Sequence, residues 1–227
     1  MDVKRNKRFS GQNDTLRLVS GGMLILGLLW FWLGWSAASY YGPCVMVPVG
    51  FVLFLIASGR HVSESEIRTT IQRHLSDLDA DITQNDEYSR RILATPGPYR
   101  GESFAFDESV NMVRRGKDAK LLSDTYCATA VFVTRDELIL RGRRISLIGD
   151  ETKDVQLMVP RAEVGLLEIC SFESPVVLSN QRNAQATARG AILCLYKING
   201  EMLYNAPVPN DMNAEALCSA IHRWKNR

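Results

Sequence analysis

The feature that most limits how this chain can fold is a long run without any charged side chain. From Leu18 to Gly59 the sequence contains no Asp, Glu, Lys, Arg or His. One straight helix through this run would measure roughly 60 Å, about twice the ~30 Å of a bilayer's hydrocarbon core. Proline interrupts a helix, so the run is expected to turn back at Gly42-Pro43. The pattern therefore predicts a hairpin of two transmembrane helices, about 18–38 and 44–59.

Aromatic and small residues fit this expectation. Six aromatic residues lie between Trp30 and Tyr41, and such rings favour the boundary between membrane and water. Small residues at helical spacing let two helices approach closely. The candidates for this hairpin packing are Gly27, Gly34 and Ala38. A secretory signal peptide is the competing interpretation, but its apolar core is usually only about 7–15 residues long.

The flanking charges predict the orientation. Residues 1–17 hold five basic and two acidic side chains, and basic flanks stay on the cytoplasmic side. We therefore expect a multi-pass protein of the cell's inner (plasma) membrane with both termini cytoplasmic. The expected segments are a basic N-terminus (1–17), the hairpin (18–59), a helical connector (60–99) and a cytoplasmic domain (100–227). The net charge is only +2, which does not favour a nucleic-acid partner.

The sequence carries no recognisable catalytic or metal-binding motif. Its five cysteines are scattered without a C-x-x-C pair, and of its three histidines only His222 lies near a cysteine, Cys218. Zinc sites usually need closely spaced ligands, and scattered thiols suit a reducing compartment. Neither G-x-S-x-G nor H-E-x-x-H occurs. We therefore expect no catalytic residue, no metal and no cofactor.

The connector has the pattern of one amphipathic helix. Ser63 and Glu66 have the spacing of a capping box. Apolar residues then recur three or four positions apart, at Ile67, Ile71, Leu75, Leu78 and Ile82. One stripe predicts one partner surface, either on this chain's own domain or on a second copy in a homo-oligomer.

After about residue 100 the periodicity changes from helical to alternating. Strands are expected at about 104–114, 127–133, 137–141, 155–159, 166–172 and 191–198. Asn199-Gly200 predicts a two-residue hairpin turn before a last strand. Asn210 or Asp211 can then cap a final helix. Its apolar face is formed by Ala214, Leu217, Ile221 and Trp224.

About half of the chain resembles a known family. The segments VFVTRDELIL (131–140) and MVPRAEVGLLEI (158–169), together with Trp224, resemble the pleckstrin-homology-like domains of bacterial membrane proteins. This resemblance implies a bent antiparallel β-sandwich or barrel capped by a C-terminal helix. The expected fold class is thus α+β, with the transmembrane hairpin and connector ahead of this domain.

The resemblance also suggests a function. Many such domains bind lipid head groups through basic residues in their first loop, which here are Arg114, Arg115, Lys117 and Lys120. A second polar loop carries Arg182 and Arg189. The preferred interpretation is a non-enzymatic, membrane-anchored adaptor that binds other membrane or cytoplasmic proteins in a larger complex. The alternative is a sensor of anionic lipid head groups on the bilayer that uses the 114–120 loop.

Overall fold

The structure is a computed structural model of the 227-residue chain. It describes residues 9, 14–33, 41–58, 62–76, 78, 90–94, 97–108, 110, 112–116, 118–149, 151–179 and 184–226. The chain divides into two compact units, Met1–Ser63 and Glu64–Arg227.

The first unit contains two helices, α2 (Asp14–Leu33) and α3 (Tyr41–Ser58), packed against each other. Glycines bring them close. A Cβ atom on Gly27 would lie 2.8 Å from Cγ2 of Val47, and one on Gly50 would lie 3.2 Å from Cγ of Leu24. These two contacts run in opposite order along the helices, so α2 and α3 are antiparallel. Of the three small residues expected at this contact, Gly34 and Ala38 lie outside the described residues.

The prediction of a transmembrane hairpin is wrong. Among the residues that the structure describes, no helix combines the length and the apolar character needed to cross a membrane. Within the described residues the uncharged run is divided between two helices. α2 begins before the run and contains Asp14 and Arg17, while α3 contains Pro43 in its first turn and Pro48 in its interior. The expected multi-pass inner-membrane localisation, with both termini cytoplasmic, rested on this hairpin and is corrected with it.

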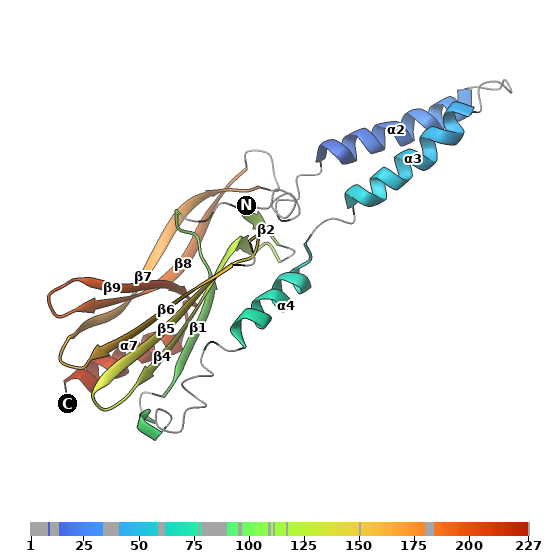
Figure 1. The fold of residues 1–227 in the computed structure, drawn as a ribbon. Coiled ribbons are helices and arrows are strands. Elements are labelled where there is room, and N and C mark those ends of the chain that lie inside the picture. Colours follow the sequence, from blue (N-terminus) through green and yellow to red (C-terminus); the bar gives the residue numbers. More distant parts are fainter. Residues whose placement is uncertain are drawn as a thin grey trace. The chain divides into compact units, whose positions relative to one another are not determined.

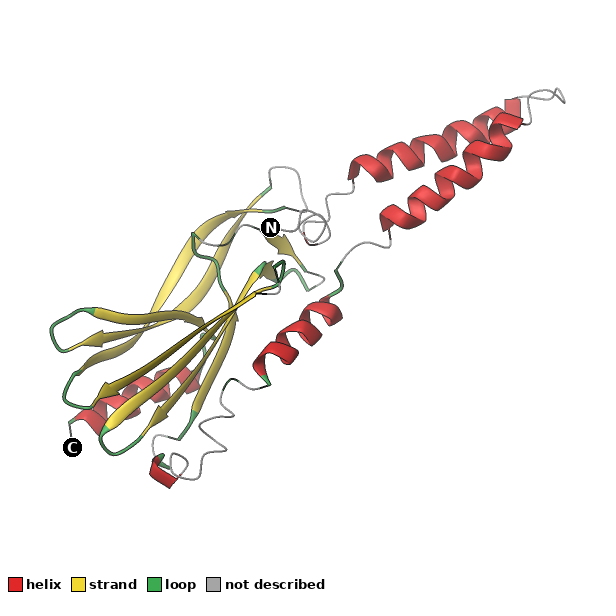
Figure 2. Ribbon diagram, in the orientation of Figure 1, coloured by secondary structure: helices red, strands yellow, loops and turns green. Residues whose placement is uncertain are grey.

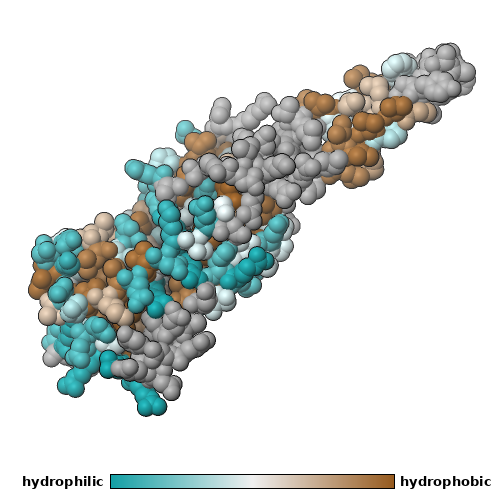
Figure 3. All heavy atoms as spheres, viewed as in Figure 1, coloured by the Kyte–Doolittle hydropathy of each residue, from teal (hydrophilic) through white to brown (hydrophobic). Residues whose placement is uncertain are grey.

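Large apolar side chains on these helices are nevertheless exposed. Leu18 is 75% exposed and Trp32 is 78% exposed, and Figure 3 shows apolar side chains (brown) along the helical pair. Exposed apolar surface of this extent marks an interaction surface in a protein.

The second unit is built from antiparallel sheets (Figures 1 and 2). One sheet has the strand order β1-β4-β5-β6, a second has the order β7-β8-β9, and β2 pairs with β3. Their bounds are β1 Tyr99–Phe104, β2 Val113–Arg115, β3 Leu121–Ser123, β4 Thr125–Val133, β5 Glu137–Ser146, β6 Glu151–Pro160, β7 Val164–Val177, β8 Gln185–Lys197 and β9 Met202–Val208. The two larger sheets enclose one hydrophobic core.

Helix α7 (Met212–Lys225) closes one end of this sandwich. The Asp211 side chain caps it by accepting a hydrogen bond from the Ala214 N–H at 3.0 Å. The indole Nε1 of Trp224 donates to the Thr134 carbonyl at 2.9 Å, and Lys225 Nζ donates to the Gly165 carbonyl at 2.7 Å. The four residues predicted for the apolar face are all buried, so the prediction of this helix is confirmed.

Helix α4 (Glu64–Leu75) belongs to the same unit and covers the other face of the four-stranded sheet. Arg143 on β5 donates to the His74 carbonyl, and Arg100 on β1 donates to the Leu75 carbonyl at 3.2 Å. The apolar stripe of α4 is buried, including Ile67 and Ile71. The connector helix therefore packs on this chain's own domain. Its cover explains why β4 is buried on both faces rather than on one.

Two local predictions are wrong. The strand expected at 104–114 is divided between β1 and β2. The turn at Asn199-Gly200 has three residues rather than two, because the Lys197 carbonyl accepts from Gly200 N–H and the Lys197 N–H donates to the Glu201 carbonyl. Within this turn only Gly200 takes a positive φ, of +83°. This is the type I turn followed by a glycine bulge that three-residue hairpins commonly use.

Candidate functional site

A cleft of about 500 Å³ lies at the end of the sandwich away from α7. The four-stranded sheet contributes Cys127, Gly142, Arg144, Lys153 and Val155 to its wall. The opposite wall includes Phe172, Ser174, Ile192, Leu203 and Asn205. Clefts of this size, apolar with a few polar groups, are typical of binding sites.

The floor of the cleft is a tyrosine that spans the sandwich. Tyr204 on β9 reaches Thr129 on β4, where the two hydroxyl oxygens lie 2.8 Å apart in a buried hydrogen bond. The ring crosses Gly142 on β5, where a Cβ atom would lie 2.3 Å from the tyrosine oxygen. A glycine is therefore required at this position, since any side chain would displace the ring. Burial raises the pKa of Tyr204 to about 12, so the phenol stays neutral.

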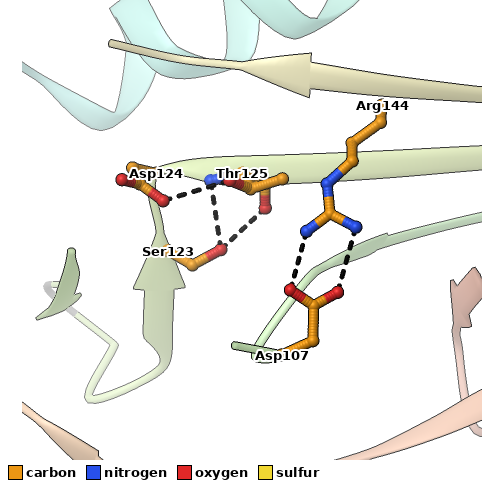
Figure 4. Close-up of polar contacts among 5 residues, drawn as sticks. All are labelled: Asp107, Ser123, Asp124, Thr125 and Arg144. Carbon is orange, nitrogen blue, oxygen red and sulfur yellow. Dashed lines mark hydrogen bonds and ion pairs between the residues drawn. The ribbon is translucent and has the colours of Figure 1, made fainter. Parts of the chain in front are cut away.

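A bidentate ion pair stands at the wall of the cleft. Arg144 Nη1 and Nη2 donate to the Asp107 carboxylate at 3.0 and 2.8 Å, and Figure 4 shows the two groups face to face. Hydrogen bonding to Asp107 raises the pKa of Arg144. The pair ties the segment after β1 to β5 across the sequence.

The end of β3 is fixed by a small buried network beside this pair (Figure 4). The Ser123 hydroxyl donates to the Thr125 carbonyl at 2.6 Å, and the Thr125 hydroxyl donates to the Asp124 carboxylate at 3.1 Å. All three residues are buried. These bonds hold the turn from β3 into β4 and so position Cys127, the first cleft residue on β4.

Arg143 points to the opposite face of the sheet from Arg144, because successive side chains of a strand alternate. Its guanidinium bonds the Asp154 carboxylate at 2.7 and 2.6 Å. It also donates to the His74 carbonyl of α4. The Arg143 guanidinium therefore joins β5, β6 and α4, and it does not supply a free positive charge to the cleft.

Lys153 is the cation of the cleft that remains available. It lies directly opposite Arg144 in the β5–β6 register, and like charges in such a pair repel. Arg144 is neutralised by Asp107, while Glu173 on the other wall is paired with Arg189 at 2.9 Å. No residue described in 64–226 pairs with the Lys153 ammonium. The cleft therefore offers one uncompensated positive charge beside an apolar surface.

The chemistry of the lining favours binding. Burial raises the pKa of the Cys127 thiol to about 11, so the thiolate needed for nucleophilic attack is scarce at neutral pH. Within the described residues no group of three or more His, Cys, Asp or Glu side chains could hold a metal ion.

The predicted basic loop is only partly exposed. Arg114 on β2 is buried, and burial lowers its pKa while the nearby Glu64 acts in the opposite direction. Gly116 faces Glu64 Oε1 of α4, where a Cβ atom would lie at 2.8 Å, so this loop packs against α4. Arg115 and Lys120 are exposed. Lys117 lies outside the described residues.

The second predicted loop divides in the same way. Arg182 lies outside the described residues. Arg189 on β8 is exposed and pairs with Glu173 directly opposite it on β7. An exposed pair of this kind contributes about 0–1 kcal/mol, so Arg189 is a surface residue of the long β7–β8 hairpin.

Sequence reasoning missed the cleft because its residues come from six strands and a loop. One signal was present: Gly142 lies inside a strand, between Arg141 and Arg143, and a glycine there suggests a close approach of another group to the backbone. Comparisons with protein-family models, curated proteins and solved structures find no match for this chain.

Proposed function

We propose that residues 64–227 form a non-enzymatic binding module, an adaptor whose cleft receives a segment of a partner protein. The observation that supports this most is the cleft of about 500 Å³ beside β6. β6 has β5 as its only strand neighbour in the described sheet. Apolar side chains such as Phe172 and Leu203 supply contact area, and the neutral Cys127 thiol offers little chemistry.

The test uses a random peptide library displayed on phage and selected against the full chain. Enriched peptides are then measured by fluorescence anisotropy against variants that fill the cleft from β9 and from β7, Leu203→Trp and Ser174→Trp. We expect at least a tenfold loss of affinity in both. Met212→Trp is the matched control, because the same side chain is added at a position that is 85% exposed. Failure to enrich any peptide, or equal binding to all three variants, would contradict the proposal.

A second candidate is recognition of anionic lipid head groups by the β2–β3 turn. Arg115 and Lys120 flank this turn, since Arg115 lies opposite Leu121 and the Gly116 N–H donates to the Lys120 carbonyl at 2.8 Å. Both side chains are exposed. Binding of the full chain to phosphatidylserine vesicles should fall when both are changed to Glu, while unchanged binding would remove this candidate.

A further inference from the structure

Strand β6 is an open edge of the described four-stranded sheet, next to the cleft. It is ten residues long, and it stands last in the order β1-β4-β5-β6. Most of its residues are exposed, including Val155 at 45% and Met158 at 42%. Such an edge presents backbone N–H and C=O groups that a further strand can pair with.

The side chains of β6 give this edge a chemical preference. Residues two apart on a strand share a face, and both Lys153 and Val155 line the cleft. Lys153 has Arg144 opposite it on β5, so its nearest charged neighbour across the sheet is also a cation. Asp154, on the other face, is held by Arg143.

We infer that the partner segment binds as an added strand on β6 and places a carboxylate beside Lys153. This inference rests on the proposed function and specifies its ligand. The added strand carries an acidic residue next to Lys153 and an apolar residue, two positions away, next to Val155. The carboxylate pairs with the uncompensated Lys153 ammonium, and the apolar side chain covers the exposed surface of the cleft.

The charges of β6 also limit what else can pair with this edge. Charged residues on an edge strand discourage indiscriminate pairing. Here the exposed Glu151 repels a uniformly acidic strand, while Lys153 attracts a single carboxylate. A segment with one acidic residue among apolar ones therefore fits better than a polyanion.

The first experiment tests the charge. A labelled peptide from the selected pool is measured against the full chain, against Lys153→Glu and against Lys120→Glu, an exposed lysine on the β2–β3 turn. We expect at least a tenfold loss with Lys153→Glu and less than a twofold change with Lys120→Glu. A peptide with its acidic residue changed to Lys should regain affinity for Lys153→Glu. Equal binding to wild type and Lys153→Glu overturns the inference.

The second experiment tests strand pairing. Two forms of the same peptide carry N-methyl groups on odd or on even residues, which removes N–H donors from one edge of the peptide strand at a time. One form should lose at least tenfold in affinity and the other should lose little. Equal effects of both forms overturn strand addition. A different outcome is that peptides bind the wild-type chain and lose affinity for Leu203→Trp, while neither Lys153→Glu nor the N-methyl groups alter their affinity. In that case the proposed function stands and this inference fails.

Discussion

The two ends of the β-sandwich differ, although several of the same strands run through both. At the α7 end, Trp224 and its neighbours fill the space between the sheets, and its indole bonds the Thr134 carbonyl. At the cleft end, Tyr204 crosses the sandwich and the space beyond it remains open, flanked by the Arg144 to Asp107 pair. The comparison separates packing that stabilises the domain from surface that is free to bind. Binding regions are commonly drawn from the less tightly packed parts of a fold.

The largest expected effect lies at the closed end. Trp224→Ala should lower the free energy of unfolding of the second unit by about 3–5 kcal/mol, because it removes a buried aromatic side chain. Hydrogen-exchange mass spectrometry of peptides from β4 to β9 measures this in the full chain. Trp224→Phe keeps most of the volume and should cost less. A change below 1 kcal/mol for Trp224→Ala would show that α7 does not hold that end.

The next effect lies where packed core meets open cleft. Gly142→Ala should lower the free energy of unfolding by about 1–3 kcal/mol, because the new methyl group displaces the Tyr204 ring. Gly149→Ala on the β5–β6 turn is the control, since its nearest neighbour is the Ser146 hydroxyl at 3.3 Å. Differential scanning calorimetry should separate the two variants clearly. Equal melting temperatures would mean that Tyr204 has room to move aside.

Alkaline titration compares the two ends through their thiols. Burial raises the pKa values of Cys127, at the cleft, and Cys218, on α7, from 9.0 to about 11. The folded state therefore holds protons that the unfolded state releases, and stability falls as the pH rises from 9 to 11. In Cys127→Ala this loss should shrink by on the order of 1 kcal/mol. Cys218→Ala should show a change of similar size, because the pKa of Cys218 is raised to the same value.

Urea unfolding at pH 8, 9, 10 and 11 measures this difference. The wild-type curve should be flat between pH 7 and 8 with respect to these thiols. If the variant curves run parallel to the wild-type curve up to pH 11, the raised pKa values of these two thiols are contradicted.

The smallest expected effect lies on the β2–β3 turn, beyond the packed core. Ala119 has a φ of 59°, a left-handed conformation that costs a residue with a side chain about 1–2 kcal/mol. Glycine relieves this strain but loses about 0.4–1 kcal/mol through the unfolded state. Ala119→Gly should therefore stabilise the domain by about 0.5 kcal/mol in urea unfolding. Asp118→Gly, one residue earlier, should not stabilise it.

Local sequence patterns predicted the closed end well. The spacing of Ala214, Leu217, Ile221 and Trp224, with Asp211 before them, predicted a capped helix, and the structure has it. Helical periodicity and capping depend on neighbours in sequence, so they can be read from one chain. The resemblance to pleckstrin-homology-like domains remains a prediction.

The cleft could not be predicted in the same way. Tyr204 and Thr129 are 75 residues apart in sequence, and nothing in either local pattern pairs them. The first basic loop misled for a related reason. Its positive charges suggested an open anion site, but Arg114 is buried and Gly116 faces Glu64 on a helix that comes some 50 residues earlier.

The long uncharged run shows a further limit. Composition alone favoured a membrane-crossing hairpin, yet the described part of the run is divided between α2 and α3, and neither helix combines the length and the apolar character needed to cross a membrane. Counting uncharged residues does not show how many of them join one apolar helix. Only the placement of the helix ends can do so.

The position of α4 in the chain has a consequence for how the domain is made. The helix covers the outer face of the four-stranded sheet, and it precedes every described strand in the sequence. Because a chain is synthesised from its N-terminus, α4 leaves the ribosome before the sheet that it will shield. When the strands emerge, α4 is therefore already available to cover the apolar outer face of the sheet. This cover limits the contact of that face with other nascent chains.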